Sequence, residues 1–223
     1  MKKHYLPFLA SSLAFGLLVS GPSPSFANAE EGKVLDLNNL AELEASGEVT
    51  IKELSYDEAI EKIAATENIS SEEAEVVYAN ATNAPSKLTR GTMGVQAVAA
   101  STTLHEIKLR QQVTSTYRPA VQIFAYMSGS GSFWQFDKLY DVDLDRKDIT
   151  YSTSKQFQGK LRAEILSLTQ IFYLINGDFY DNGTTTITGS VTASGVVWSG
   201  TGTISNSSSH FKYWNNSGYY NSY

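Results

Sequence analysis

Four aspartates lie close together near the middle of the chain, at Asp141, Asp143, Asp145 and Asp148. Alternating carboxylates can gather the oxygen ligands that Ca²⁺ prefers. A twelve-residue calcium loop also needs glycine at its sixth position and glutamate at its twelfth, where this chain has Arg146 and Ser152. On a strand, the first three carboxylates would simply share the solvated face. We therefore predict no metal and no cofactor, and keep calcium at these four residues as the weaker alternative.

Aromatic residues are concentrated towards the C-terminal part of the sequence. Exported β-proteins commonly bind sugars by stacking them on exposed Trp and Tyr rings, while amide side chains serve the hydroxyls. Core packing is the alternative, and it is strongest for Trp198. The run from Tyr213 to Tyr223 is harder to bury, so we expect a contact surface there. The candidate ligand-binding residues are Trp198, Tyr213, Trp214, Asn215, Tyr219 and Tyr220.

Thr, Ser and Gly dominate residues 184–205, which should form a β-hairpin. Its composition resembles the stems of β-barrel pore-forming toxins, whose strands turn small polar residues to the lumen and apolar ones to lipid. A membrane strand needs roughly nine to eleven residues, and these strands are just long enough. An ordinary sheet with one wet, threonine-rich face is the alternative.

Support for catalysis is slight. Asp178 and Asp181 are an example of paired carboxylates that could act as acid and base, but spacing alone does not establish this. No nucleophile elbow, metalloprotease motif or phosphate loop occurs in the sequence. The chain has no cysteine, which excludes disulfides, thiol nucleophiles and cysteine zinc sites. We therefore expect a protein that is not an enzyme.

The first 29 residues have the features of a secretory signal peptide. A basic start at Lys2 and Lys3 precedes an apolar stretch, Pro22 and Pro24 follow it, and Ala27-Asn28-Ala29 fits a signal-peptidase site. We expect cleavage after Ala29, secretion from the cell, and no transmembrane helix in the mature chain. A lysine-rich signal on a cysteine-free exported chain resembles products of Gram-positive bacteria.

Charge divides the remaining chain into two unequal parts. Residues 30–82 hold fourteen acidic residues and three lysines, a net charge of about −11, whereas residues 83–223 carry about +3. The acidic part contains two Ser-x-x-Glu capping boxes, at Ser55–Glu58 and Ser70–Glu73, each before a helical pattern. Residues 63–70 resemble the turn of a DNA-binding helix-turn-helix, but acidic residues at the next helix would repel phosphate. We expect no nucleic-acid partner.

We call the acidic part the leader and predict that it forms a helical hairpin. The hairpin is either a pro-region that caps the β domain or a solvated spacer. Residues 83–103 read as a linker, because small residues, Pro85 and two glycines replace the periodic pattern. From residue 104 to 223 the pattern becomes that of strands separated by glycine turns. Residues 160–175 also fit a helix, although their Ile, Phe, Tyr and Thr content favours two strands. We expect a turn at Asp181–Gly183 and another at Ser194–Gly195.

The sequence thus predicts a mainly β protein, an antiparallel β-sandwich or barrel at about 104–223, preceded by a small acidic helical hairpin. Its predicted organisation is a signal peptide (1–29), a leader (30–82), a linker (83–103) and a β domain (104–223). The leading functional hypothesis is a secreted binding module for a glycan, cell-wall or protein surface. The alternative is a secreted pore-forming protein with an inhibitory leader.

Overall fold

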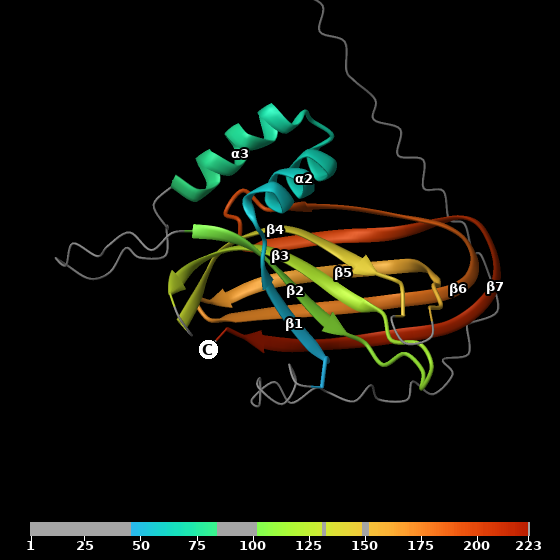
Figure 1. The fold of residues 1–223 in the computed structure, drawn as a ribbon. Coiled ribbons are helices and arrows are strands. Elements are labelled where there is room, and N and C mark those ends of the chain that lie inside the picture. Colours follow the sequence, from blue (N-terminus) through green and yellow to red (C-terminus); the bar gives the residue numbers. More distant parts are fainter. Residues whose placement is uncertain (1–45, 84–101, 131–132, 149–151, 223) are drawn as a thin grey trace, which may run out of the picture.

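The computed structural model describes residues 46–83, 102–130, 133–148 and 152–222. Two antiparallel sheets pack face to face as a sandwich, and a pair of helices lies at one end of it (Figure 1). The predicted fold class is confirmed, as a sandwich with an N-terminal helical hairpin. The predicted signal peptide and linker lie outside the described residues, except for Asn83, Thr102 and Thr103 at the two ends of the linker.

The first sheet has the strand order β1-β2-β3-β4 and is antiparallel throughout. Its strands are β1 (Val49–Glu53), β2 (Thr102–Arg110), β3 (Ala120–Ser130) and β4 (Phe133–Asp145). The strand β1 was not expected from the sequence, which indicated only helices in the leader. It pairs with β2 so that Ile51 lies opposite Ile107. Part of the acidic leader is therefore an edge strand of the sandwich.

The strand β4 departs from simple alternation. The sequence pattern placed Tyr140 on the same face as Phe136 and Val142. Register shifts between β3 and β4 instead turn Leu139 into the core, where it is 3% exposed, and put Tyr140 on the outer face. There its ring packs edge-on against that of Tyr126, with centroids 5.9 Å apart. The prediction for Tyr140 was wrong because a bulge reverses the facing of the residues that follow it.

The second sheet is built from three strands, each of which pairs with the other two. These are β5 (Gln156–Ser167), β6 (Gln170–Val191) and β7 (Val197–Asn221). Because β6 and β7 are long and bent, the start of β6 pairs with the end of β7, while the end of β6 pairs with the start of β7. The strand β5 lies between the start of β6 and the start of β7 (Figure 1). Two strands over residues 160–175, rather than a helix, are confirmed.

The expected turn at Asp181–Gly183 is absent, because β6 runs through it. Register shifts after Phe179 and after Asn182, together with a φ of 117° at Gly183, bend the strand there instead. Glycine tolerates this positive φ without steric cost. The second expected turn is present at Ser194–Gly195, where the chain passes from β6 to β7.

The core lies between the two sheets and contains side chains from both. The first sheet contributes residues such as Ile107, Ile123 and Phe136, and the second contributes Phe157, Phe179 and Trp198. The indole of Trp198 lies across two glycines, because a Cβ at Gly189 or Gly200 would come within 2.1 or 2.2 Å of it. A side chain at either glycine would displace the ring.

The two helices, α2 (Tyr56–Glu67) and α3 (Ser71–Asn83), begin where the capping boxes predicted. At α2, Glu58 N–H donates to the Ser55 hydroxyl and Ser55 N–H donates to the Glu58 carboxylate. The same reciprocal pair joins Ser70 and Glu73 at α3. Asn68 ends α2 in the left-handed conformation, with φ of 54°. These local signals fix where the two helices begin and where α2 ends.

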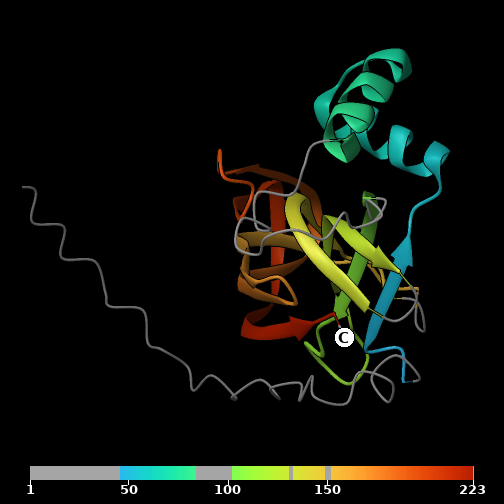
Figure 2. The same cartoon turned by 90° about the vertical axis from the view of Figure 1, so that its left-hand side faces the viewer.

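The helices lie at one end of the first sheet (Figure 2), and there they bury part of its outer face. Leu54 and Ala59 form a buried cluster with Leu104, Phe124 and Tyr126. The outer-face rings of Phe124 and Tyr126 are consequently only 6% and 1% exposed. Towards one side, the ammonium of Lys62 on α2 lies 2.7 Å from the Asp141 carboxylate on β4 and 4.0 Å from the centre of the Phe124 ring. The leader therefore makes apolar, hydrogen-bonded and ionic contacts with the sandwich.

Candidate functional site

The C-terminal half of β7 separates the predicted ligand-binding residues into two groups. Trp214 and Tyr220 face the core, at 9% and 1% exposure, whereas Tyr213 and Tyr219 point outwards at 44% and 52%. Asn215 is also exposed. The separation follows from the two-residue period of a strand. Trp198 at the start of β7 is buried at 2%. The structure therefore brings only Tyr213, Asn215 and Tyr219 together at an accessible surface.

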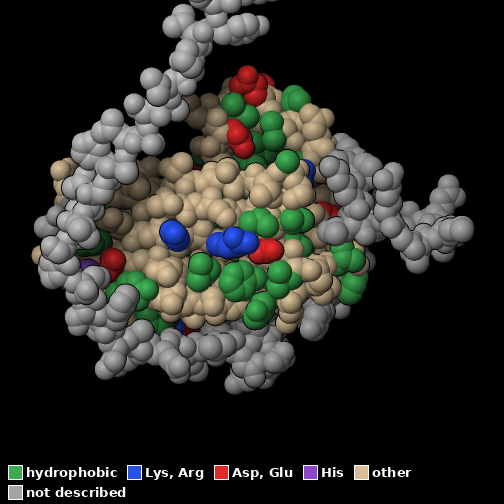
Figure 3. Space-filling model, turned by 180° about the vertical axis from the view of Figure 1, so that it is seen from behind, with side chains coloured by type: hydrophobic (Ala, Val, Ile, Leu, Met, Phe, Trp, Pro, Cys, Tyr) green, Lys and Arg blue, Asp and Glu red, His purple; other side chains and the backbone are tan. Residues whose placement is uncertain are grey.

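Side chains of β6 complete that surface. Phe172 lies beside Tyr219, with ring centroids 5.6 Å apart, and Asn176 lies beside Asn215. The Tyr213 hydroxyl donates to the Asn176 side-chain oxygen at 3.1 Å. We call this surface the open face, and Figure 3 looks onto that side of the molecule, where hydrophobic side chains gather beside charged ones. It comprises Phe172, Leu174, Asn176, Tyr213, Asn215 and Tyr219.

Charged side chains of β5 border the open face. Lys160, Arg162 and Glu164 lie opposite Asn176, Leu174 and Phe172 of β6. The Arg162 guanidinium donates to the Glu164 carboxylate at 2.7 Å. The open face thus offers ring surfaces for stacking, amides that can donate and accept, and charged groups at its border.

Sequence reasoning missed the β6 residues of this surface, Phe172, Leu174 and Asn176. In the structure, the odd-numbered residues of 171–179 are buried and the even-numbered ones are half-buried, but residues 171–175 are all apolar or aromatic, so the sequence shows no alternation there. The β6 half of the open face therefore had no signal in the sequence.

The four aspartates of the predicted acidic run have other partners. The Asp141 carboxylate contacts Lys62, and that of Asp143 accepts the backbone N–H of Leu144 at 2.7 Å. Asp145 lies 3.6 Å from Lys108. Asp148 is buried and accepts the backbone N–H of Arg118 at 2.7 Å. Within the described residues, no three acidic or histidine side chains are grouped as a metal site would require.

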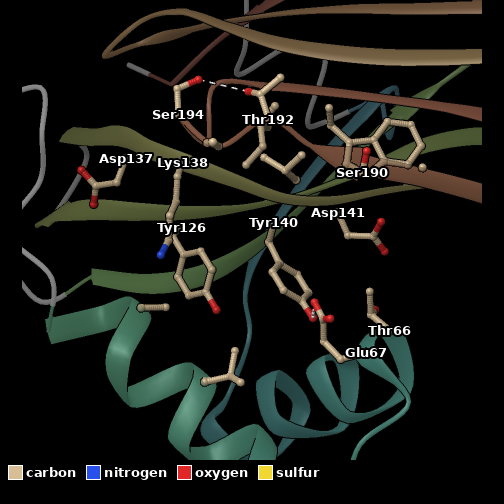
Figure 4. Close-up of a pocket in the computed structure, with 18 of the residues that line it drawn as sticks. Thr66, Glu67, Tyr126, Asp137, Lys138, Tyr140, Asp141, Ser190, Thr192 and Ser194 are labelled. Carbon is tan, nitrogen blue, oxygen red and sulfur yellow. Dashed lines mark hydrogen bonds between the residues drawn. The ribbon is translucent and has the colours of Figure 1, made fainter. Parts of the chain in front are cut away.

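A cavity of about 840 Å³ lies between the helices, β4 and the β6–β7 turn (Figure 4). Glu67, Tyr126, Lys138 and Tyr140 are among its lining residues. The Tyr140 hydroxyl donates to Glu67 at 3.4 Å, whereas the buried Tyr126 hydroxyl has no hydrogen-bond partner among the described residues. Burial raises the pKa of both tyrosines. Both hydroxyls therefore remain protonated donors at neutral pH.

A second cavity of about 510 Å³ adjoins the first and shares Thr66, Asp141, Gly189 and Trp198 with it. Together the cavities form a groove between β4 and the end of β6, bordered by α2. Sequence reasoning did not predict this groove, because its walls come from segments far apart in the chain.

No protein-family model, curated protein or solved structure matches this chain. Within the described residues, neither helix is long and apolar enough to cross a membrane. The functional argument therefore depends on the geometry of the surfaces just described.

Proposed function

We propose that this protein is a secreted, non-enzymatic binding module that attaches to extracellular glycan, such as a cell wall, through its open face. The observation that carries this proposal is the exposure of Tyr213 and Tyr219 together on one sheet face, with Asn215 between them along β7. Flat ring surfaces flanked by amides suit the apolar faces and hydroxyls of sugars.

The exposed rings are not needed to fill the core. On the same strand, Trp214 and Tyr220 already supply the buried aromatic surface. Large apolar side chains grouped on an open surface typically mark a contact site. The pairing of Phe172 with Tyr219 and the hydrogen bond from Tyr213 to Asn176 orient the rings before a ligand arrives. Such preorganisation reduces the entropy lost on binding.

Secretion is part of the proposal and is supported by the sequence of the first 29 residues, which lie outside the described region. Mass analysis of the protein in the medium and in the cells tests it. We expect a chain in the medium that begins at Glu30 or further along. A chain retained in cells with Met1 to Ala29 intact would contradict secretion.

Sedimentation with insoluble cell-wall glycan tests the binding function. We expect the purified protein to co-sediment, and the double variant Tyr213→Ala/Tyr219→Ala to lose at least about tenfold in affinity, since each stacked ring is worth roughly 0.5–1.5 kcal/mol beyond its buried area. Tyr56→Ala is the matched control, because Tyr56 is 51% exposed but lies on α2. Equal retention of the double variant and the control would contradict the proposal.

A second candidate, the secreted pore former, is favoured by one observation. The predicted hairpin forms, with residues 184–191 of β6 paired to residues 198–205 of β7. Its outer face carries only hydroxyl side chains, all of them exposed, whereas its inner face includes Ile187 and Trp198. The outer-face residues are Thr184, Thr186, Thr188, Ser190, Ser199, Thr201, Thr203 and Ser205. This alternation is the pattern of a membrane β-hairpin.

Dye release from liposomes, after limited proteolysis within residues 84–101, tests this candidate. Release that depends on cleavage would favour the pore former, whose leader would then be inhibitory. Vesicles that remain dye-tight would contradict it, and the same preparation could still be assayed for glycan binding.

A further inference from the structure

The four outer strand edges of the two sheets differ in how their backbone groups are satisfied. The outer strands are β1 and β4 in the first sheet, and the C-terminal halves of β6 and β7 in the second. An edge strand turns unpaired N–H and C=O groups outwards, and proteins commonly protect such edges with charges, bulges or covering segments. Among the described residues, only one of these four edges lacks such protection.

The edge of β4 is closed by hydrogen bonds along its length. The N–H of Phe136 donates to Leu168 O at 2.6 Å, and that of Leu139 donates to Gly195 O at 2.7 Å. Further along, the N–H groups of Val142 and Leu144 donate to the side chains of the aspartates that precede them, at 2.8 and 2.7 Å. The acidic run therefore protects an edge from strand addition.

Two other edges are protected by their size or surroundings. The strand β1 has only five residues, and two of them, Lys52 and Glu53, are charged. The end of β6 lies across the second cavity from β4, since Thr185, Ile187 and Asp143 all line that cavity. The edge of β1 is therefore short and partly charged, whereas the end of β6 is uncharged over residues 184–191 but faces β4 across that cavity.

The C-terminal half of β7 combines length, regular pairing and lack of charge, and no other strand of the described residues faces it. It pairs with β6 from Asn221 to Tyr213 without a register shift. Residues 213–222 contain no charged residue and no proline. No strand of the described chain pairs with its other side. A long, regular and uncharged edge of this kind readily accepts another strand.

We propose that this edge pairs antiparallel with the same edge of a second copy of the chain. A register centred on Asn216 places Tyr213 opposite Tyr219 of the other copy, and Asn215 opposite its Ser217. Aromatic cross-strand pairs and hydrogen-bonding pairs both stabilise antiparallel strands, and the absence of charge removes any repulsion. The contact is isologous, so it closes as a two-fold dimer. The open faces of the two copies would then form one continuous surface.

Measurement of the molar mass in solution tests the dimer. We expect the purified chain to be dimeric at concentrations well above a Kd of about 1 µM. The double variant Asn215→Glu/Ser217→Glu places like charges opposite each other across the proposed contact, and we expect it to weaken dimerisation at least about tenfold.

Ser199→Glu/Thr201→Glu is the matched control. It adds the same charge to exposed positions of the same strand, but Ser199 is paired on both sides, with Arg162 and with Ser190. We expect the control to dimerise as the unaltered chain does, and both variants to keep the cooperative unfolding transition. A monomeric unaltered chain would overturn the proposal and leave the edge for a strand of another protein. A dimer that persists in the edge variant would also overturn it, by placing the contact elsewhere.

Discussion

The outer faces of the two sheets both carry aromatic residues, but the part of the chain that the structure describes covers only one of them. On the first sheet, Phe124 and Tyr126 are buried beneath the helices of the leader. On the second, Tyr213 and Tyr219 are exposed and Phe172 is half-buried. The same chain therefore uses outward-facing rings once for internal packing and once for an open surface.

This difference between the two outer faces shows that the helical hairpin shields apolar side chains of the first sheet from water. Without it, the rings of Phe124 and Tyr126 and the side chain of Leu104 would form a second exposed apolar surface. The hairpin buries them with its own Ala59, and the strand β1, which precedes it in the leader, joins the same sheet. The leader is thus part of the structure of the sandwich, whether or not the chain is later cut.

The largest expected difference is between equivalent ring deletions on the two faces. Phe124→Ala should lower the free energy of unfolding by about 3–4 kcal/mol, because it leaves a cavity beneath the helices. Phe172→Ala should lower it by only about 1 kcal/mol, since the ring is half-buried and water can fill the space. Urea denaturation of both variants measures the difference. Equal losses would mean that the two faces are not distinguished by packing.

Two lysines, one against each sheet, provide the next largest expected difference in stability. Lys62 lies over Phe124 and contacts Asp141, while Lys155 lies over Phe211 at 4.4 Å and contacts Asp181 at 2.6 Å. The Asp141 side chain is 18% exposed, and that of Asp181 is 41% exposed. Lys62→Ala should therefore cost about 1–2 kcal/mol, because it leaves a carboxylate partly buried. Lys155→Ala should cost about half as much or less.

Chemical denaturation at low and high salt separates these two cases. The loss caused by Lys155→Ala should shrink as salt screens the exposed pair, whereas the loss caused by Lys62→Ala should largely remain. If both losses disappear at high salt, the contact between α2 and β4 is as solvated as a surface pair.

Local signals explain how much of this fold could be predicted. The capping boxes at Ser55 and Ser70 and the glycine turn at Ser194–Gly195 act within a few residues, so the sequence alone located both helices and the turn between β6 and β7. Alternation similarly indicated most of the strands.

Features that depend on distant partners could not be read in this way. The short strand β1 forms because β2 offers it an edge, and its alternation of Val49 and Ile51 with polar residues spans only five residues, too few to stand out beside the two capping boxes. The facing of Tyr140 depends on bulges against β3. Of the open face, only the β7 residues were predicted, because its β6 half requires knowledge of which strands are neighbours.

The protonation of a buried histidine tests how well the first sheet excludes water. His105 on β2 is 3% exposed, and its ring packs against Trp134 with centroids 4.6 Å apart. Burial lowers the pKa of His105 below its ordinary value. The unfolded chain then binds a proton more readily than the folded one, so this residue's contribution is fully present above the unfolded value of about 6.5 and is lost as the pH falls from there through the lower pKa of the folded chain.

His105→Gln should remove that dependence. We expect the difference in unfolding free energy between the unaltered chain and His105→Gln to shift in favour of the variant as the pH falls from about 7.5 to about 5. His210→Gln is the control, because His210 is exposed at the edge of the second sheet beside Asp178. A difference that stays constant over this pH range would mean that His105 binds a proton as readily in the folded chain as in the unfolded one, and would contradict the lowered pKa.

The smallest expected effect concerns two buried tyrosine hydroxyls. Tyr117 donates to the carbonyl oxygen of Arg146 at 2.9 Å, whereas the Tyr126 hydroxyl, at the covered face, has no partner among the described residues. Tyr117→Phe should therefore lower the free energy of unfolding by about 1 kcal/mol. Tyr126→Phe should change it by less than about 0.5 kcal/mol or raise it slightly, because it removes a buried polar group that makes no compensating bond. Thermal unfolding of both variants measures this. A loss for Tyr126→Phe as large as that for Tyr117→Phe would mean that a polar partner occupies the cavity beneath the helices and bonds to Tyr126.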